Sequence, residues 1–138
     1  MPSTEVLGTI GETRAVEFFL RHGWLVDAPV LSGSPYDLHI HKGDRKFFVQ
    51  CKYRTVNRGV VEIKNKRIRG KGKDKTFQYD LDKIQVFTIF VPVKDVLLVI
   101  PSSRIKCSLR IRLTKSKNGQ VELTNSADEF INPKWICE

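Results

Sequence analysis

Four polar side chains in the first half of the chain could act together on a phosphate: Glu12, Asp37, Gln50 and Lys52. Carboxylate oxygens suit a hard divalent cation such as Mg²⁺, which usually takes one or two of them with waters and substrate phosphate. The backbone carbonyl of Cys51 could be a third protein ligand, and Gln50 a neutral ligand or a partner for metal-bound water. Lys52 could steady the attacking water or the charge on the phosphate. Such a metal lowers the pKa of its water, so the expected chemistry is attack of water at a phosphate.

A β-hairpin is predicted to hold Asp37 and Gln50 in place. Two runs with alternating apolar residues flank residues 43–44, a Gly-Asp dipeptide that suits a two-residue turn of type II′. That turn places Lys42 opposite Arg45 and, in the same register, Asp37 opposite Gln50, with Cβ atoms roughly 5 Å apart. Side chains alternate between the faces of a strand, so polar and apolar positions separate. The polar face holds Asp37, His39, Gln50 and Lys52, and the core face holds Leu38, Ile40, Val49 and Cys51.

A long helix is predicted to carry Glu12. It begins at a cap, Ser3 or Thr4, and ends before Gly23, a suitable C′ residue. Gly11 lies inside it at a cost of about 1 kcal/mol relative to Ala, so we expect another backbone to approach there. Glu12 then falls at the edge of the buried stripe. The apolar positions that recur at helical spacing are Leu7, Ile10, Ala15, Phe18 and Phe19.

The rest of the chain predicts a mixed sheet. Strands are expected at residues 24–28, 60–64, 86–91, 96–100 and 109–113, short helices at 80–85 and 126–130, and loops or turns at 29–35, 70–73, 92–95 and 117–119. The two runs at 86–91 and 96–100 are continuously apolar, which is typical of central strands covered on both faces. We therefore predict a single domain, residues 1–138, of the α/β or α+β class, with the first helix packed against the sheet.

The charge of the chain favours an anionic partner. Lys and Arg number 24 against 15 Asp and Glu, giving a formal net charge of +9 and a pI near 9.7. Nucleic acid is the usual partner of so basic a protein, and an acidic membrane surface is a less common one. The expected DNA contacts are Arg54, Lys64, Lys66, Arg67, Arg69, Lys71, Lys73, Lys75, Arg110 and Arg112.

Several classes of protein are disfavoured. Cys51, Cys107 and Cys137 are odd in number and form no C-x-x-C pair, which argues against a disulfide framework or a cysteine zinc site and suits a reducing cell interior. Glu5 stands where a signal peptide would be basic and then apolar. The longest apolar run, residues 86–93, is too short to span a bilayer. We expect a soluble intracellular protein of the cytoplasm or nucleoid, with no membrane partner.

Three other motifs suggest weaker hypotheses. His39-x-His41 could chelate a transition metal, although no Cys or further His completes the site, and His39 more simply lines a cleft beside Asp37. Residues 70–73, Gly-Lys-Gly-Lys, lack the Walker spacing of a phosphate-binding loop. Ser102 has no nearby histidine in the sequence, so a serine nucleophile is unsupported.

The arrangement of Glu12 in a first helix, Asp37 on a strand and Gln50-x-Lys52 on the next strand resembles the PD-(D/E)xK nuclease superfamily. Most members carry Asp or Glu at the position of Gln50. The Gln form resembles a narrower branch, the homing endonucleases encoded in cyanobacterial group I introns and related predicted endonucleases. The likeness covers residues 8–12, 36–38 and 49–52, and more weakly residues 79–87 and the strand ending at Pro101.

This resemblance implies a restriction-endonuclease-like fold and a Mg²⁺-dependent, sequence-specific endonuclease of double-stranded DNA that leaves 5′-phosphate and 3′-hydroxyl ends. Glu12 and Asp37 would bind Mg²⁺, with Mn²⁺ able to substitute, and the Gln branch would retain activity. Cutting both strands requires two active sites, so a homo-oligomer, either dimer or tetramer, and a pseudo-palindromic target are expected. The interface would lie in the second half of the chain, with its apolar strands and an exposed tail at Trp135.

Two alternatives stay open. A Holliday-junction resolvase would keep the fold and change the substrate. A catalytically inert DNA-binding module would account for the missing acid at Gln50.

Overall fold

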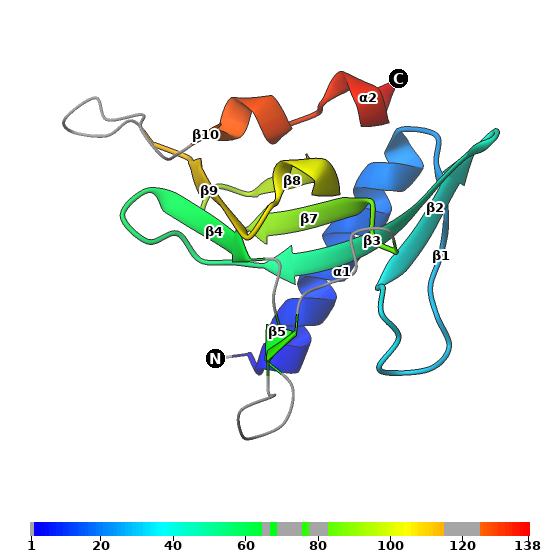
Figure 1. The fold of residues 1–138 in the computed structure, drawn as a ribbon, viewed down its shortest axis with the longest axis horizontal. Coiled ribbons are helices and arrows are strands. Elements are labelled where there is room, and N and C mark those ends of the chain that lie inside the picture. Colours follow the sequence, from blue (N-terminus) through cyan, green and yellow to red (C-terminus); the bar gives the residue numbers. More distant parts are fainter. Residues whose placement is uncertain (1, 65–66, 69–75, 78–82, 115–124) are drawn as a thin grey trace.

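The computed structural model describes residues 2–64, 67–68, 76–77, 83–114 and 125–138, and is built on a five-stranded mixed sheet in the order β1-β2-β3-β7-β8 (Figure 1). Its strands are β1 (Leu25–Asp27), β2 (Leu38–Lys42), β3 (Arg45–Tyr53), β7 (Val86–Val91) and β8 (Val96–Pro101). β3 and β7 pair in parallel, and the other neighbours pair antiparallel. The predicted α+β class with a mixed sheet is therefore confirmed.

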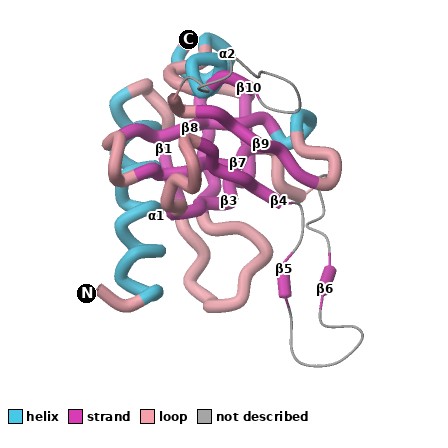
Figure 2. The backbone as a smooth tube through the Cα atoms, turned by 90° about the vertical axis from the view of Figure 1, so that its left-hand side faces the viewer, coloured by secondary structure: helices cyan, strands magenta, loops and turns pink. Residues whose placement is uncertain are grey.

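The remaining elements surround this sheet. Helix α1 (Thr4–Arg21) lies on one side of it, and a second sheet lies on the other (Figure 2). That second sheet has the order β10-β9-β4, from β10 (Asn125–Ser126), β9 (Ser108–Arg112) and β4 (Val60–Lys64). The other elements are β5 (Arg67–Ile68), which pairs with β6 (Thr76–Phe77), the 3₁₀ helices η1 (Ser102–Arg104) and η2 (Ala127–Phe130), and α2 (Lys134–Cys137).

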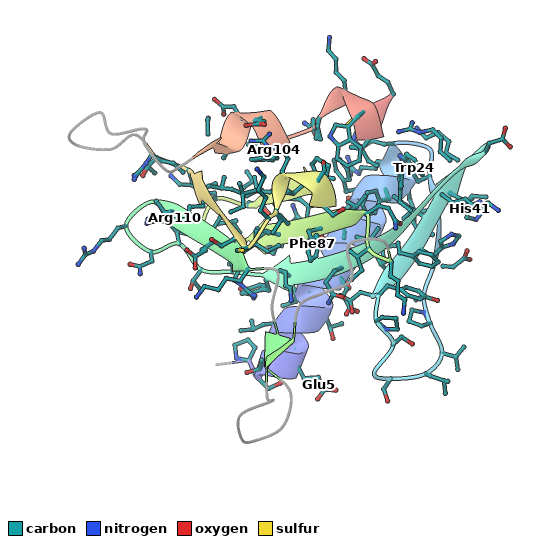
Figure 3. The ribbon with its side chains drawn as sticks, viewed as in Figure 1. Glu5, Trp24, His41, Phe87, Arg104 and Arg110 are labelled. Carbon is teal, nitrogen blue, oxygen red and sulfur yellow. The ribbon has the colours of Figure 1, made fainter. Side chains whose placement is uncertain are left out.

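Strand β7 separates two hydrophobic cores, and all six of its residues are buried. Phe87, at the centre of Figure 3, packs with β4, β9 and η2, whereas Val86 packs with Ala15 and Phe19 of α1. The expectation of a central strand covered on both faces is confirmed for β7. β8 is also covered on both faces, because Leu98 and Ile100 pack in one core and Val99 in the other. Its predicted central position is wrong, because β8 is the edge strand of the sheet as described.

The predicted hairpin forms in the predicted register. Lys42 pairs with Arg45 and Leu38 with Val49, and the backbone N–H of Asp37 donates to the carbonyl of Val49 at 2.9 Å. Gly43 has φ of +59° while Asp44 keeps a negative φ, as a type II′ turn requires. The core face is also confirmed, because Leu38, Ile40, Val49 and Cys51 all pack in the core beneath α1.

Helix α1 begins and ends as expected. The Ser3 hydroxyl accepts a hydrogen bond from the Val6 N–H at 3.2 Å, and Gly23 follows the helix with φ of +85°. The close approach predicted at Gly11 is confirmed, since a Cβ there would lie 3.2 Å from the backbone oxygen of Lys52. This contact fixes α1 against the end of β3.

Some smaller expectations turn out differently. Residues 83–85 form a turn and irregular chain where a helix over 80–85 was predicted, and residues 80–82 lie outside the described residues, as do the loop at 70–73 and the turn at 117–119. The helix predicted at 126–130 is the 3₁₀ helix η2, capped by Ser126. Trp135 is half-buried rather than an exposed tail, because it packs edge-on against Phe47. None of the described helices is long and apolar enough to cross a membrane.

Candidate active site

Asp37 is held by two hydrogen bonds from β3. Its Oδ2 accepts from the side-chain Nε2 of Gln50 at 2.8 Å and from the backbone N–H of Cys51 at 2.8 Å. Gln50 is 9% exposed, so little water competes for the amide. Hydrogen bonds to an ionised carboxylate are stronger than neutral ones. The two arms of the hairpin therefore fix one carboxylate oxygen of Asp37.

Helix α1 brings the second carboxylate to the same place. Because Gly11 has no side chain, the helix comes within van der Waals contact of the Lys52 backbone, and Glu12 follows directly. Glu12 and Asp37 line one pocket of about 280 Å³, here called the carboxylate pocket, together with residues 28–34 and Tyr36. Partial burial, and then the charge of Asp37, raise the pKa of Glu12 above its ordinary value of 4.5. The two acids therefore repel each other in the protein alone.

Cys51 and Lys52 contribute in different ways. Burial raises the pKa of the Cys51 thiol well above its usual range, so this side chain stays neutral and belongs to the core, while its backbone N–H serves Asp37. Lys52 is half-buried. Its backbone pairs with Ile89 of β7, and this register fixes the position of Lys52 along the strand. The predicted grouping of Glu12, Asp37 and Gln50 is thus present at one place, with Lys52 two residues beyond Gln50 on the same face of β3.

The donor set fits a hard divalent cation. Two carboxylates that repel each other share one pocket, and the other polar side chains that line it are hydroxyls. Oxygen ligands of this kind are the ones that Mg²⁺ prefers. Across the part of the chain that the structure describes, no three or more His, Cys, Asp or Glu side chains are arranged to hold a metal ion. The transition-metal hypothesis for His39 and His41 is therefore unsupported; both rings face Asp27 instead, at 3.5 Å.

The expected DNA contacts are only partly described. Lys66, Arg69, Lys71, Lys73 and Lys75 lie outside the described residues, and only the backbone of Arg67 is described, in β5. On the second sheet, Lys64 and Arg110 both face Glu62, at 3.6 Å and 3.9 Å, so part of their charge is compensated. Figure 3 shows Arg110 at the opposite end of the molecule from His41.

Two further arginines were expected to contact DNA. Arg112 is half-buried with Nε unpartnered among the described residues. Arg54 is exposed directly after β3 and donates to the carbonyl of Tyr53 at 3.0 Å. Arg54 is therefore the expected contact nearest to Lys52 in the chain.

Sequence reasoning missed the wall of the carboxylate pocket. Residues 28–34 line it beside both acids, although residue 28 was predicted to end a strand and 29–34 to belong to a turn-rich loop. Within them Val30 and Leu31 are strongly exposed. The available signal was an apolar pair in a loop that leads directly to Asp37.

The model of the PD-(D/E)XK endonuclease family matches residues 2–132, so the chain belongs to this family, as the Glu12, Asp37 and Gln50-x-Lys52 pattern predicted. Members of this nuclease family generally use divalent metal ions. No curated protein matches the sequence significantly. Among solved structures, the chain is similar to the bacterial homing endonuclease I-Ssp6803I, with a TM-score of 0.73 at 20% identity over 97% of this chain and 91% of the other. At that identity the similarity establishes the fold.

Proposed function

We propose that this protein is a Mg²⁺-dependent, sequence-specific endonuclease of double-stranded DNA, of the homing type, which leaves 5′-phosphate and 3′-hydroxyl ends. The observation that carries the proposal is the carboxylate pocket, where Asp37 is fixed by Gln50 and Cys51 and faces the charge of Glu12. The family assignment makes the substrate a nucleic acid, and the net charge of +9 favours long polyanions such as DNA.

The residues have distinct roles in this proposal. Glu12, Asp37 and the backbone carbonyl of Cys51 would hold Mg²⁺, with Mn²⁺ able to substitute. The bound ion supplies charge that polarises the phosphate and lowers the pKa of water. The ammonium group of Lys52 stabilises the attacking water and the charge that develops on the phosphate oxygens. Gln50 orients Asp37 by donating a hydrogen bond from its amide to Oδ2.

The absence of an acid at Gln50 is compatible with activity. An acid there would add a third negative charge to a pocket where Glu12 and Asp37 already repel each other. The amide lowers the total charge of the site and replaces repulsion by a 2.8 Å hydrogen bond. Mg²⁺ commonly binds through one or two carboxylates only.

The remaining parts of the proposal concern partners. Cleavage of both strands needs two active sites, which a homodimer or homotetramer would supply, with the target pseudo-palindromic to match. Arg54, Lys64, Arg110, Arg112 and the basic residues of 65–75 are the proposed phosphate contacts. The three cysteines of the sequence are free thiols in the structure, in keeping with the proposed action in the cytoplasm or nucleoid.

Cleavage of a long mixed-sequence DNA tests the proposal. Wild type and Lys52→Ala are compared in Mg²⁺, in Mn²⁺ and in EDTA, and the ends are mapped by sequencing. Wild type is expected to give a few discrete products with either metal, and the variant and the EDTA sample to give none. Sedimentation with the mapped target measures the oligomeric state.

Other outcomes of the cleavage experiment would assign a different function to the carboxylate pocket. Intact linear DNA together with cut four-way junctions would indicate a junction resolvase of the same fold. Binding without any metal-dependent cleavage of either substrate would overturn the endonuclease and leave an inert DNA-binding module.

A further inference from the structure

Two neighbouring aliphatic side chains are exposed to solvent at the tip of the loop between β1 and β2. Val30 is 98% exposed and Leu31 is 78% exposed, the two largest values among the large hydrophobic residues that the structure describes. Single exposed aliphatic residues are ordinary, but an adjacent pair at one tip forms an apolar surface that water solvates poorly. The pair is therefore a candidate contact surface.

This tip has a defined shape without a ligand. The Ser34 hydroxyl donates to the backbone carbonyl of Leu31 at 2.9 Å and closes the turn, in which Gly33 takes φ of +82°. Pro29 and Pro35 stand on either side of the turn and restrict their own φ angles. Little conformational entropy is then lost when the tip meets a partner.

The tip lies beside the two acids. Val30 and Leu31 belong to the same carboxylate pocket as Glu12 and Asp37. In both Figure 1 and Figure 2 the loop extends beyond the sheet on the side where α1 begins and where β5 lies. A substrate bound at the two carboxylates would therefore lie beside these two side chains.

The loop is apolar and uncharged although the chain is strongly basic. Residues 28–36 contain no charged side chain, whereas the whole chain carries +9. Ser32, Ser34 and Tyr36 of the loop could contact phosphate or sugar oxygens, but Val30 and Leu31 at its tip could not. Aliphatic side chains next to DNA suit the minor groove, where such residues enter between base pairs, unstack them and kink the duplex.

We propose that Val30 and Leu31 insert into the minor groove of double-stranded DNA next to the cleaved phosphate and open the base step there; this inference rests on the proposed endonuclease function. Opening a step is easiest at flexible pyrimidine–purine steps such as TA and CA. The pair therefore adds a sequence preference at the cleavage site that requires no hydrogen bond to a base.

The test compares Val30→Ser/Leu31→Ser with Val93→Ser. Val93 is a matched control, since it is 73% exposed, in the β7–β8 turn, and does not line the carboxylate pocket. Each protein is titrated in EDTA into a duplex containing the mapped cleavage site, with 2-aminopurine at the cleaved step as a fluorescent report of unstacking. Lys52→Ala is included because it separates base opening from hydrolysis.

Wild type, Val93→Ser and Lys52→Ala are expected to raise the 2-aminopurine fluorescence several-fold on binding. The double variant should give no rise and bind about tenfold more weakly, equivalent to 1.4 kcal/mol. Its salt dependence should equal that of wild type, because an apolar contact releases no counterions. Thermal melting is expected to be unchanged for a pair so exposed.

Three results would overturn the insertion. In the first, the double variant opens the step as wild type does. In the second, it changes the sedimentation of the protein without DNA, which would assign the tip to contact with a second copy of the chain. In the third, wild type cuts no DNA, so that the endonuclease itself fails. Cleavage by wild type together with either of the first two results leaves the endonuclease standing.

Discussion

The side-chain amide of Gln50 donates a hydrogen bond to Oδ2 of Asp37 at 2.8 Å, across the two arms of one hairpin. The family resemblance aligns Gln50 with a position where most members have an acid, and in this structure its amide donates to the carboxylate of Asp37. A donor and an acid have opposite effects on Asp37: the donor stabilises the charge of Asp37 at all times, whereas an acid is tolerated only when a cation lies between the two.

Gln50→Glu should therefore make folding depend on metal. In EDTA the new carboxylate faces Asp37 in a buried position and loses the hydrogen bond, which should lower the free energy of unfolding by about 1–3 kcal/mol. Millimolar Mg²⁺ should recover most of this loss. Urea unfolding with and without Mg²⁺ measures both effects. Gln50→Met, uncharged and of similar length, is the control: Mg²⁺ should stabilise it no more than it stabilises wild type. An equal gain from Mg²⁺ in Gln50→Glu and Gln50→Met would contradict the explanation.

Glu12→Gln should stabilise the metal-free protein while abolishing cleavage. Burial and Asp37 raise the folded pKa of Glu12, so the stability linked to its proton is complete below the unfolded value near 4.5 and is lost as pH rises through the raised value. Removing this acid should therefore raise the unfolding free energy at neutral pH and change nothing below about pH 4.5. The gain should be small, because solvent screens a partly exposed group.

Urea unfolding in EDTA at a series of pH values measures the Glu12→Gln effect. Glu17→Gln, on the same helix, is the control: it removes an exposed pair with Arg21 and should keep the Mg²⁺ stabilisation that Glu12→Gln loses. An equal Mg²⁺ effect on wild type and Glu12→Gln would show that Glu12 binds no metal.

Two glycines of α1 should respond in opposite ways to alanine. Gly8 has open space around its Cβ position, so Gly8→Ala should stabilise the protein by up to about 1 kcal/mol through helix propensity. At Gly11 the new methyl group would lie 3.2 Å from the Lys52 carbonyl, a backbone atom that can move only with its strand. Gly11→Ala should therefore cancel much of the propensity gain and lower kcat about tenfold or more, as expected when catalytic groups are misplaced.

Melting temperatures and single-turnover cleavage rates distinguish these effects. A Gly11→Ala protein with an unchanged rate would show that the spacing between α1 and β3 does not govern the site.

The cysteines should react with iodoacetamide in a fixed order. The thiolate is the reactive form, so the exposed Cys107 should react first. Burial raises the pKa of both other thiols, by far the more for Cys51, which should react last and only as fast as the protein unfolds. Mass spectrometry of partly alkylated protein measures the order, and urea should remove it. Early alkylation of Cys51 in the native protein would contradict its burial in the core.

The parts of this fold that depend on local patterns could be predicted from the sequence. The hairpin register follows from the turn at Gly43 and the alternation around it, and the contact at Gly11 follows from the cost of glycine within a helix. Neither feature says which backbone approaches Gly11, so the grouping of Glu12 with Asp37 was a hypothesis supported by the resemblance to the PD-(D/E)xK superfamily. These features involve neighbours in sequence or a single close approach between two elements.

The features that depend on distant pairing could not be predicted. Val60 pairs with Arg112 in a second sheet, and nothing local in either strand specifies this partner. Apolar composition also made β8 look central, although its position at the edge of the sheet is set by tertiary topology. The lining of the carboxylate pocket by residues 28–34 depends on where the loop folds back, which a turn-rich composition leaves undetermined.

The chain leaves β3 just after Lys52 and returns as β7 beside it, in parallel, after residues 54–85. The two strands are held together by their own ladder and by a core on each face, so the alignment of Gln50 and Lys52 does not depend on the length of the intervening crossover. Within this segment β4 contributes Val61 and Ile63 to the core, and Ile84 is buried with them, so only insertions outside these residues should leave the alignment unchanged. For the proposed endonuclease, such insertions are expected to alter which DNA is bound while the arrangement of Asp37, Gln50 and Lys52 stays unchanged.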